Sequence, residues 1–445
     1  MAMKNLKKYL LWFANDHVDF RLSEIEAIAS LFKTTIIWKE EPSHKPFWIV
    51  ELPSDEVARQ IANRSVTLKF VTELWASSNK IEDLHNDLKT YSSNVLQHDE
   101  VFKKSSFKFK VDVFCNTQSY AEKMAKIETF SYLPIKGPVK LADPDITFQY
   151  CEFYGTDPNN VPAEPYHLFF GKLISKSKRK LIHDFSLKKR KFIGNTSMDP
   201  EMSLIMANHA KVEANDLVYD PFVGSGSLLV AAAYFGAYVS GVDIDFLMVH
   251  GKTKPTRKQT RHIARQGENV LANLTQYGME SKYLDVLVGD SSLPLWRNEL
   301  KFDAIITDPP YGIREATERV GSKKSRTFND PEAAARFPPK VIYTFHQILS
   351  DLLFFSSSHL NLGGRLVTWI PVFREDYSES TYIPEHPCFK LISNCEQVLS
   401  RVVSRRLLTF EKLREPTDED LELCKIEDNK FREKYFNYKY NKSSS

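Results

Sequence analysis

The chain has 445 residues, 42% of them hydrophobic and 12% aromatic, which is enough for two to four domains with substantial cores. No apolar run reaches the ~18 residues of a membrane span, and the five scattered cysteines include no Cys-x-x-Cys pair, so no membrane partner, disulfide framework or metal site is expected. The net charge of +3 is uninformative by itself, and the cysteine usage predicts a reducing, cytoplasmic compartment.

The first 165 residues predict two small α+β units. In residues 1–70, strand-like runs flank amphipathic helical patterns in an order typical of a ferredoxin-like domain. Residues 71–165 alternate similarly, with one of the expected strands at 139–141. Turn-forming residues at 157–165 mark a boundary, and 166–190 is predicted to be a linker.

Two basic runs lie on either side of a glycine-containing turn at 224–226. Nine Lys or Arg fall in 171–191 against one acid, and six fall in 251–266 with no acid. Such clusters can follow a phosphate backbone, although each could be ordinary solvated surface. Together they favour a nucleic-acid substrate. The second run is expected to be a flexible loop before a helix near Ala264.

Three successive apolar runs end in a carboxylate. The first ends at Asp220 and leads through Gly224 and Gly226 into a helical pattern, so that backbone N–H groups can approach a ligand closely. The second ends at Asp243, 19 residues after Gly224, where a Rossmann-like unit holds a ribose diol. The third ends at Asp290, which could accept from an adenine amino group. No third glycine follows at the dinucleotide spacing, so S-adenosyl-L-methionine is favoured over NAD or FAD.

A fourth apolar run, 302–307, leads into Asp308-Pro309-Pro310-Tyr311-Gly312. The prolines have no N–H, so their carbonyls and the carboxylate present only acceptors, and Tyr311 offers a face for a base. Two acceptors can hold the hydrogens of an exocyclic amine and turn its lone pair toward a methyl group. Positioning of this kind can lower the activation free energy by roughly 7–11 kcal/mol. The alternative is a strand-ending Asp followed by a plain Pro-Pro turn.

The remaining chain completes a sheet. A polar insertion at 321–339 could be a lid, an RNA contact or a plain loop, and it precedes a helical pattern at 341–360 and a strand at 365–370. Runs at 389–393 and 407–410 predict an antiparallel hairpin at the sheet edge, which gives seven mostly parallel strands. Ligands of such sheets lie beyond the carboxyl ends of the strands, where all four acids fall.

These motifs, together with Asn195-Thr196-Ser197-Met198-Asp199, resemble the class I amino-methyltransferases, and in particular the catalytic subunits of the eukaryotic tRNA (guanine-N2)-methyltransferases that modify guanine 10. The resemblance is specific over about 165–415 and diffuse before that. It implies a seven-stranded, Rossmann-like α/β methyltransferase domain at 191–415, preceded by an α+β region of ferredoxin-like and THUMP RNA-binding domains. A C-terminal extension at 416–445 is expected to hold a short helix and a frayed tail. The family also implies a tRNA substrate and a small zinc-binding activator subunit.

The resemblance implies roles for the motif residues. Asp308 and the Pro309 carbonyl are expected to grip the guanine 2-amino group, and the expected catalytic residues are Asp308, Pro309, Pro310 and Tyr311. Arg190 and Arg314 are expected substrate contacts, with surface charge as the alternative. The residues expected to bind S-adenosyl-L-methionine are Thr196, Ser197, Met198, Asp220, Phe222, Gly224, Gly226, Asp243, Ile244, Asp290 and Ser291.

Two alternatives stay open. Asp-Pro-Pro-Tyr also serves amino-methyltransferases acting on DNA or on other RNA sites, although no DNA target-recognition domain is evident here. A catalytically inactive RNA-binding scaffold is the other alternative, against which the intact acids and prolines argue. The spacing does not distinguish monomethylation from dimethylation.

Overall fold

The computed structural model of the chain describes residues 6–252, 268–315, 317–321, 339–422 and 430–443, and it divides into two compact units, Met1–Lys180 and Leu181–Ser445. The predictions for the basic loop at 251–266, for a helix starting near Ala264 and for the insertion at 321–339 lie almost wholly outside the described residues. Among the helices described, none is long and apolar enough to cross a membrane.

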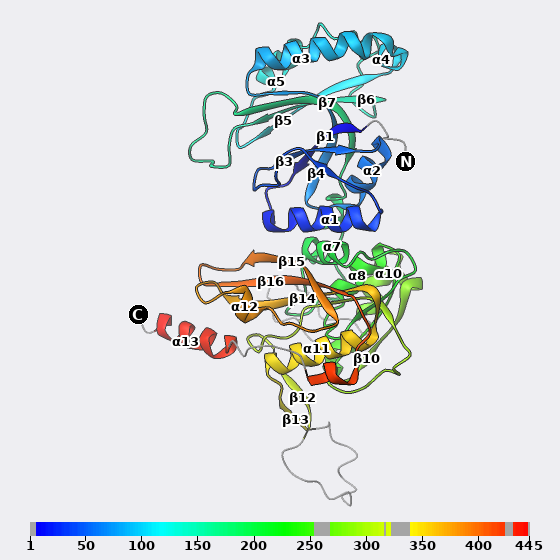
Figure 1. Cartoon of the computed structure of the whole chain (residues 1–445), viewed down its shortest axis with the longest axis vertical. Helices are drawn as coiled ribbons and strands as arrows, with labels where there is room; N and C mark the ends of the chain where they lie inside the picture. Colours follow the sequence, from blue (N-terminus) through cyan, green and yellow to red (C-terminus); the bar gives the residue numbers. More distant parts are fainter. Residues whose placement is uncertain (1–5, 253–267, 316, 322–338, 423–429, 444–445) are drawn as a thin grey trace, which may run out of the picture. The chain divides into compact units, whose positions relative to one another are not determined.

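The N-terminal unit is built on one continuous sheet of seven strands in the order β2-β3-β1-β4-β7-β6-β5 (Figure 1). All neighbouring strands are antiparallel except β5 and β6. The strands are β1 (Lys7–Phe13), β2 (Ile37–Trp38), β3 (Phe47–Leu52), β4 (Leu68–Ser78), β5 (Phe107–Phe114), β6 (Ile146–Phe153) and β7 (His167–Lys176). The helices are α1 (Arg21–Leu31), α2 (Asp55–Arg64), α3 (Ile81–Asn94), α4 (Glu100–Lys104) and α5 (Tyr120–Glu128).

Three details of the N-terminal prediction are corrected. The boundary at residue 70 falls inside β4, so the two expected domains share a sheet. The expected linker at 166–190 contains β7, whose apolar residues are buried between β4 and β6. Residues 139–141 form no strand, and only a single bridge joins Val139 to Phe107.

The C-terminal unit contains the predicted seven-stranded sheet, in the order β10-β9-β8-β11-β14-β16-β15. The first five strands are mutually parallel, and β16 runs antiparallel to both of its neighbours. The strands are β8 (Leu217–Asp220), β9 (Tyr238–Asp243), β10 (Tyr283–Val288), β11 (Phe302–Thr307), β14 (Leu360–Phe373), β15 (Phe389–Val398) and β16 (Val403–Lys412). A small ribbon, β12 (Glu318–Val320) with β13 (Lys340–Ile342), forms a separate sheet.

Helices cover both faces of this sheet, with α7, α8 and α10 on one side and α11 on the other (Figure 1). A buried cluster that includes Phe302, Leu352 and Leu408 joins strands to α11. The helix predicted at 341–360 begins later, at Phe345, because Thr344 and Gln347 form a capping box there. The helices are α6 (Lys180–Asp184), α7 (Pro200–His209), α8 (Ser227–Tyr234), α9 (Phe246–Val249), α10 (Val270–Gln276), α11 (Phe345–His359), α12 (Glu379–Tyr382) and α13 (Phe431–Ser443).

Candidate active site

A cavity of about 1200 Å³ opens at the carboxyl ends of β8, β9, β10 and β11. Most residues that the sequence assigned to catalysis, cofactor or substrate line it together, although they come from separate strand ends. Those lining residues are Thr196, Ser197, Met198, Asp220, Phe222, Gly224, Asp243, Ile244, Asp290, Ser291, Asp308, Pro309, Pro310, Tyr311 and Arg314. The cavity is larger than the roughly 300–1000 Å³ typical of one small-molecule site, so it has room for a cofactor and part of a second ligand.

The glycine turn forms one side of the cavity. Gly224 has φ +51°, and a Cβ added there would meet no atom within 4 Å, so its open face points into free space. Its N–H donates to Asp243 Oδ2 at 2.8 Å, which ties the turn to the end of β9. Asp243 Oδ1 also accepts from the N–H of Asp245 at 2.8 Å. The carboxylate of Asp243 therefore shapes the turn in addition to lining the cavity.

Several carboxylates lie close together around the cavity, and burial disfavours their charged forms. Burial raises the pKa of Asp220 to about 7, and the charges of Asp243 and Asp308 push it up as well, although Thr307 and the Phe222 N–H donate to it. Burial likewise raises the pKa of Asp243 to about 6. A cation in the cavity would relieve this mutual repulsion.

Asp308 is held at the end of β11 by two donors. Arg405 Nη1 on β16 donates to Asp308 Oδ2 at 3.1 Å, and the hydroxyl of Tyr311 donates to Asp308 Oδ1. Burial raises the pKa of Asp308, and the guanidinium of Arg405 opposes that rise. The Tyr311 ring stands edge-on to Phe345, with centroids 5.8 Å apart. Each carboxylate oxygen retains a second lone pair that can accept from a ligand.

Arg405 is itself fixed on several sides. Its guanidinium carbon lies 4.0 Å from the centroid of the Trp369 ring, and Nε donates to Gln397 at 2.7 Å. Its Nη2 also contacts the sulfur of Met198 at 3.2 Å. Burial lowers the pKa of Arg405, but Tyr311 and Asp308 raise it by more, so the guanidinium stays protonated.

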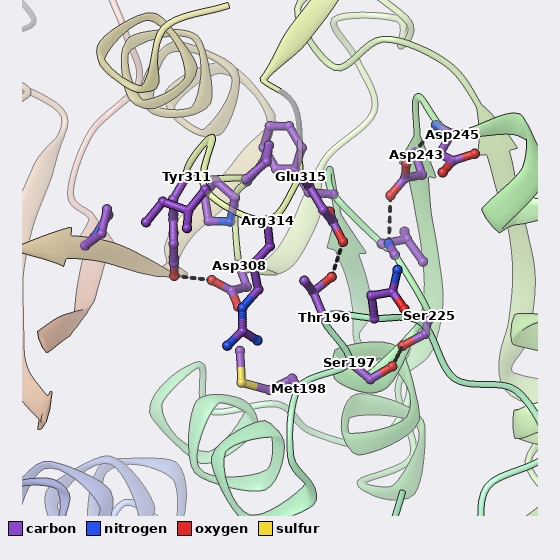
Figure 2. Close-up of a pocket in the computed structure, with 18 of the residues that line it drawn as sticks. Thr196, Ser197, Met198, Ser225, Asp243, Asp245, Asp308, Tyr311, Arg314 and Glu315 are labelled. Atoms are coloured by element: carbon purple, nitrogen blue, oxygen red, sulfur yellow. Dashed lines mark hydrogen bonds between the residues drawn. The ribbon is translucent and has the colours of Figure 1, made fainter. Parts of the chain in front are cut away.

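The segment around 196–198 crosses between the two ends of the cavity (Figure 2). Thr196 donates to Glu315, which follows the Asp308 motif, and the hydroxyls of Ser197 and Ser225 lie 2.6 Å apart. In the view of Figure 2, the Thr196–Glu315 contact lies between the Asp308–Tyr311 pair and the Asp243–Asp245 pair, and the Ser197–Ser225 contact lies below the latter pair. The segment thus connects the glycine turn with the loop after β11.

Of the remaining predicted residues, some line the cavity and others pack behind it. Asp290 lines the cavity, but its oxygens accept from the N–H groups of Ser292 and Val320 at 2.9 and 2.5 Å, so it also anchors β12. Arg314 lines the cavity and is exposed. Gly226 lies behind the turn, where an added Cβ would meet Val270 Cγ1 at 2.5 Å.

Arg190 does not reach the cavity, contrary to its predicted role as a substrate contact. Its side chain is buried, and Nη1 donates to Ser227 Oγ at 2.6 Å while Nη2 donates to the Phe185 carbonyl at 3.2 Å. Ser227 is the first residue of α8. Arg190 therefore supports the helix that follows the glycine turn.

Some cavity-lining residues were not predicted from the sequence: Arg405, Glu315 and, on α13, Phe431, Tyr435, Tyr438 and Lys439. Arg405 carries no local signal, because it lies within the predicted strand hairpin and reaches Asp308 only after β16 pairs with β14. Glu315 directly follows Arg314 in the motif loop. The aromatic residues of α13 lie in the expected C-terminal extension, for which a short helix and a frayed tail were predicted without any site residue.

Comparisons with known proteins show which sequences and structures the chain resembles. The chain matches a family model described as the Tmrp11 THUMP N-terminal domain over residues 7–179, and one described as an RMKL-like methyltransferase domain over residues 188–330. A Bos taurus protein named tRNA (guanine(10)-N(2))-methyltransferase TRMT11 is 46% identical over 97% of this chain and 95% of its own length. The tRNA (guanine(10)-N(2))-methyltransferase of Saccharomyces cerevisiae is 35% identical over 97% of this chain and 99% of its own. The crystal structure of TrmN from Thermus thermophilus has 16% identity and a TM-score of 0.44, covering 91% of this chain and 100% of that one.

Proposed function

This chain belongs to the tRNA (guanine(10)-N(2))-methyltransferase family, and from that premise we propose that it transfers a methyl group from S-adenosyl-L-methionine to the exocyclic 2-amino group of guanine 10 in tRNA. The observation that carries the proposal is the single cavity shared by Asp308 and the glycine turn at Gly224. The cavity thus joins an acceptor that can hold an amine to a turn that can hold a cofactor.

The cavity fits this cofactor in shape and in charge. The open face of Gly224 leaves backbone space that a side chain would fill. Burial and neighbouring carboxylates raise the pKa of Asp220 to about 7 and that of Asp243 to about 6, so a positively charged ligand would favour their ionised forms. When bound, S-adenosyl-L-methionine supplies an electrophilic methyl group on a positively charged sulfur. We assign Asp220 and Gly224 to its methionine part, Asp243 to its ribose, and Asp290 with Ser291 to its adenine.

Asp308 and Pro309 position the amine. The guanine amino nitrogen is a weak nucleophile, because its lone pair is delocalised into the ring. The free lone pairs of the Asp308 carboxylate and the Pro309 carbonyl accept its two hydrogens, which directs the nitrogen lone pair away from the ring plane. The new N–C bond would replace the methyl–sulfur bond of the cofactor, whose sulfur would leave as a neutral thioether, and one N–H proton would leave to water. Arg405 and Tyr311 keep the carboxylate in place, and the Arg405 guanidinium favours its ionised form.

The N-terminal unit supplies RNA contacts in this proposal. It matches the THUMP model, and basic residues such as Lys108 and Lys110 lie on β5 at the edge of its sheet. Lysines can neutralise phosphates without reading sequence. We also propose a cytoplasmic location, which rests on the cysteine usage of the chain.

A second subunit is proposed at one edge of the methyltransferase sheet. Strand β10 is an edge strand, and Leu284, Leu287 and Val288 on it are 54%, 40% and 44% exposed. An apolar open edge of this kind invites pairing with another chain. We assign it to the small zinc-binding activator that the family implies, which would cover these side chains and add to the sheet.

The function is tested by incubating the chain and its small partner with unmodified tRNA and S-adenosyl-L-methionine, followed by mass spectrometry of the nucleosides and mapping of the modified position. We expect N2-methylguanosine at position 10. The Asp308→Asn variant should bind the cofactor and lose at least about 100-fold in rate, because a carboxylate acceptor becomes a partial donor. Methylation of DNA alone, or of another tRNA position, would overturn the proposal.

A further inference from the structure

The C-terminal helix α13 (Phe431–Ser443) forms part of the wall of the active-site cavity. Phe431, Tyr435, Tyr438 and Lys439 line the cavity and occupy positions i, i+4, i+7 and i+8 of the helix. Such spacings place side chains on one face of a helix. The short helix expected in the C-terminal extension thus presents one face to the proposed site of methyl transfer.

The first two turns of α13 are anchored to the catalytic loop and to β14. Phe431 is buried against Phe373, with ring centroids 5.3 Å apart. Arg432 Nε donates to the carbonyl of Gly312 at 2.9 Å, and Gly312 closes the Asp308 motif. Lys434 forms an ion pair with Asp376 at 2.7 Å. The helix is therefore positioned by the same loop that carries the amine acceptors.

Beyond these anchors, two cavity-lining side chains remain available. Tyr438 is 41% exposed, and Lys439 is exposed next to it. Among the described residues, neither makes a hydrogen bond, an ion pair or a ring contact. An open aromatic face beside an ammonium group is the chemistry that binds a nucleotide, through stacking on the base and attraction to its phosphate.

We propose that Tyr438 and Lys439 bind the nucleotide that neighbours the target guanine, with the tyrosine ring stacked on its base and the lysine on its phosphate. This inference rests on the proposed function. Asp308 and Tyr311 are the less exposed part of the cavity and hold the reacting base, whereas Tyr438 lies in its more open part. A base drawn out of a helix into such a cavity brings its adjacent nucleotide to the cavity mouth.

The test compares Tyr438→Ala with Phe436→Ala, because Phe436 lies on the same helix and is 43% exposed but does not line the cavity. We expect Tyr438→Ala to raise the KM for tRNA roughly 5- to 100-fold, as for loss of one stacked base. Tyr438→Phe should restore it, and Phe436→Ala should leave it unchanged. Affinity for S-adenosyl-L-methionine, measured by calorimetry, should be the same in all three variants, which also shows that they are folded.

Lys439→Gln tests the phosphate contact separately. The salt dependence of log KM should become shallower by about one, as expected for one lost phosphate contact. A wild-type KM in Tyr438→Ala, or an equal rise in Phe436→Ala, would overturn the inference while wild-type methylation of tRNA still upheld the function. An inactive wild-type enzyme would overturn both.

Discussion

Arg405 Nη1 lies 3.1 Å from Asp308 Oδ2, and this ion pair joins residues that are 97 positions apart in the chain. It connects the catalytic end of β11 with β16, two strands away in the sheet. Since the guanidinium also lies over Trp369, it can move little without disturbing the core. Asp308 is thus presented to the cavity as an oriented acceptor whose ionised form the guanidinium favours.

Replacing Arg405 is expected to slow methyl transfer while sparing cofactor binding. Arg405→Gln removes the charge that opposes the rise in the pKa of Asp308, so the carboxyl becomes protonated at higher pH and ceases to accept. We expect kcat to fall roughly 100- to 1000-fold, with the acidic limb of the pH–rate profile shifted upward. Arg405→Lys should recover part of the rate, because it retains charge without the planar fork. Unchanged kcat in Arg405→Gln would show that Asp308 needs no partner.

Cofactor affinity is expected to rise with pH. Burial raises the pKa of Asp220 to about 7, so the cofactor-free protein holds a proton there that an unfolded chain loses above about pH 4. The folded state binds more protons in that window, and the free energy of unfolding therefore falls as pH rises through it. A bound cation favours the ionised carboxylate, so affinity should increase by up to about tenfold per pH unit below 7.

Calorimetry at about pH 5.5 and 7.5 checks this linkage. The matched control is Asp220→Asn, which cannot ionise and should show weaker binding with a flatter pH dependence. A wild-type affinity that does not change with pH would mean that Asp220 is already ionised in the cofactor-free enzyme.

Alanine substitutions at the two glycines of the turn are expected to affect different properties, one the stability of the fold and the other cofactor binding. Both have positive φ, which costs roughly 1–2 kcal/mol with a side chain. Gly226→Ala would also place a Cβ 2.5 Å from Val270, so a lower melting temperature is expected. Gly224→Ala meets no atom but enters the cavity, so it should mainly weaken cofactor binding. Equal losses of stability and affinity in both variants would contradict this division.

Lysines on strand β10 are expected to prevent binding of the proposed activator subunit. Leu284→Lys with Val288→Lys places charges on the exposed edge, which should abolish co-purification of the small subunit and make the isolated chain less prone to aggregate. Val398→Lys on β15, the opposite edge, is the control, since Val398 is 54% exposed. Loss of the complex in the control but not in the double variant would place the partner on the other edge.

Local sequence patterns predicted the parts of the site that are themselves local. A strand that ends in a carboxylate is contiguous, so Asp220, Asp243 and Asp308 were assigned correctly to strand ends. Arg190 and Arg405 show the limit, because one basic residue is buried behind a helix and the other meets Asp308 only through sheet pairing. In β7, Gly171 interrupts the apolar run. A Cβ at Gly171 would lie 1.9 Å from the Glu73 carbonyl oxygen, so the close approach of β4 requires glycine at this position. The same glycine breaks the apolar pattern from which the strand could have been predicted.

The location of Arg405 on β16 also governs when catalytic competence can arise during protein synthesis. A ribosome-bound chain that has emerged only through α11 contains the glycine turn and the Asp-Pro-Pro-Tyr motif, but no guanidinium to orient the carboxylate. The strand that delivers it is translated after β15 and must insert between β14 and β15. A nascent chain therefore carries both sequence motifs well before it holds the side chain that orients Asp308, so we expect competence for methyl transfer only once that late strand is in place.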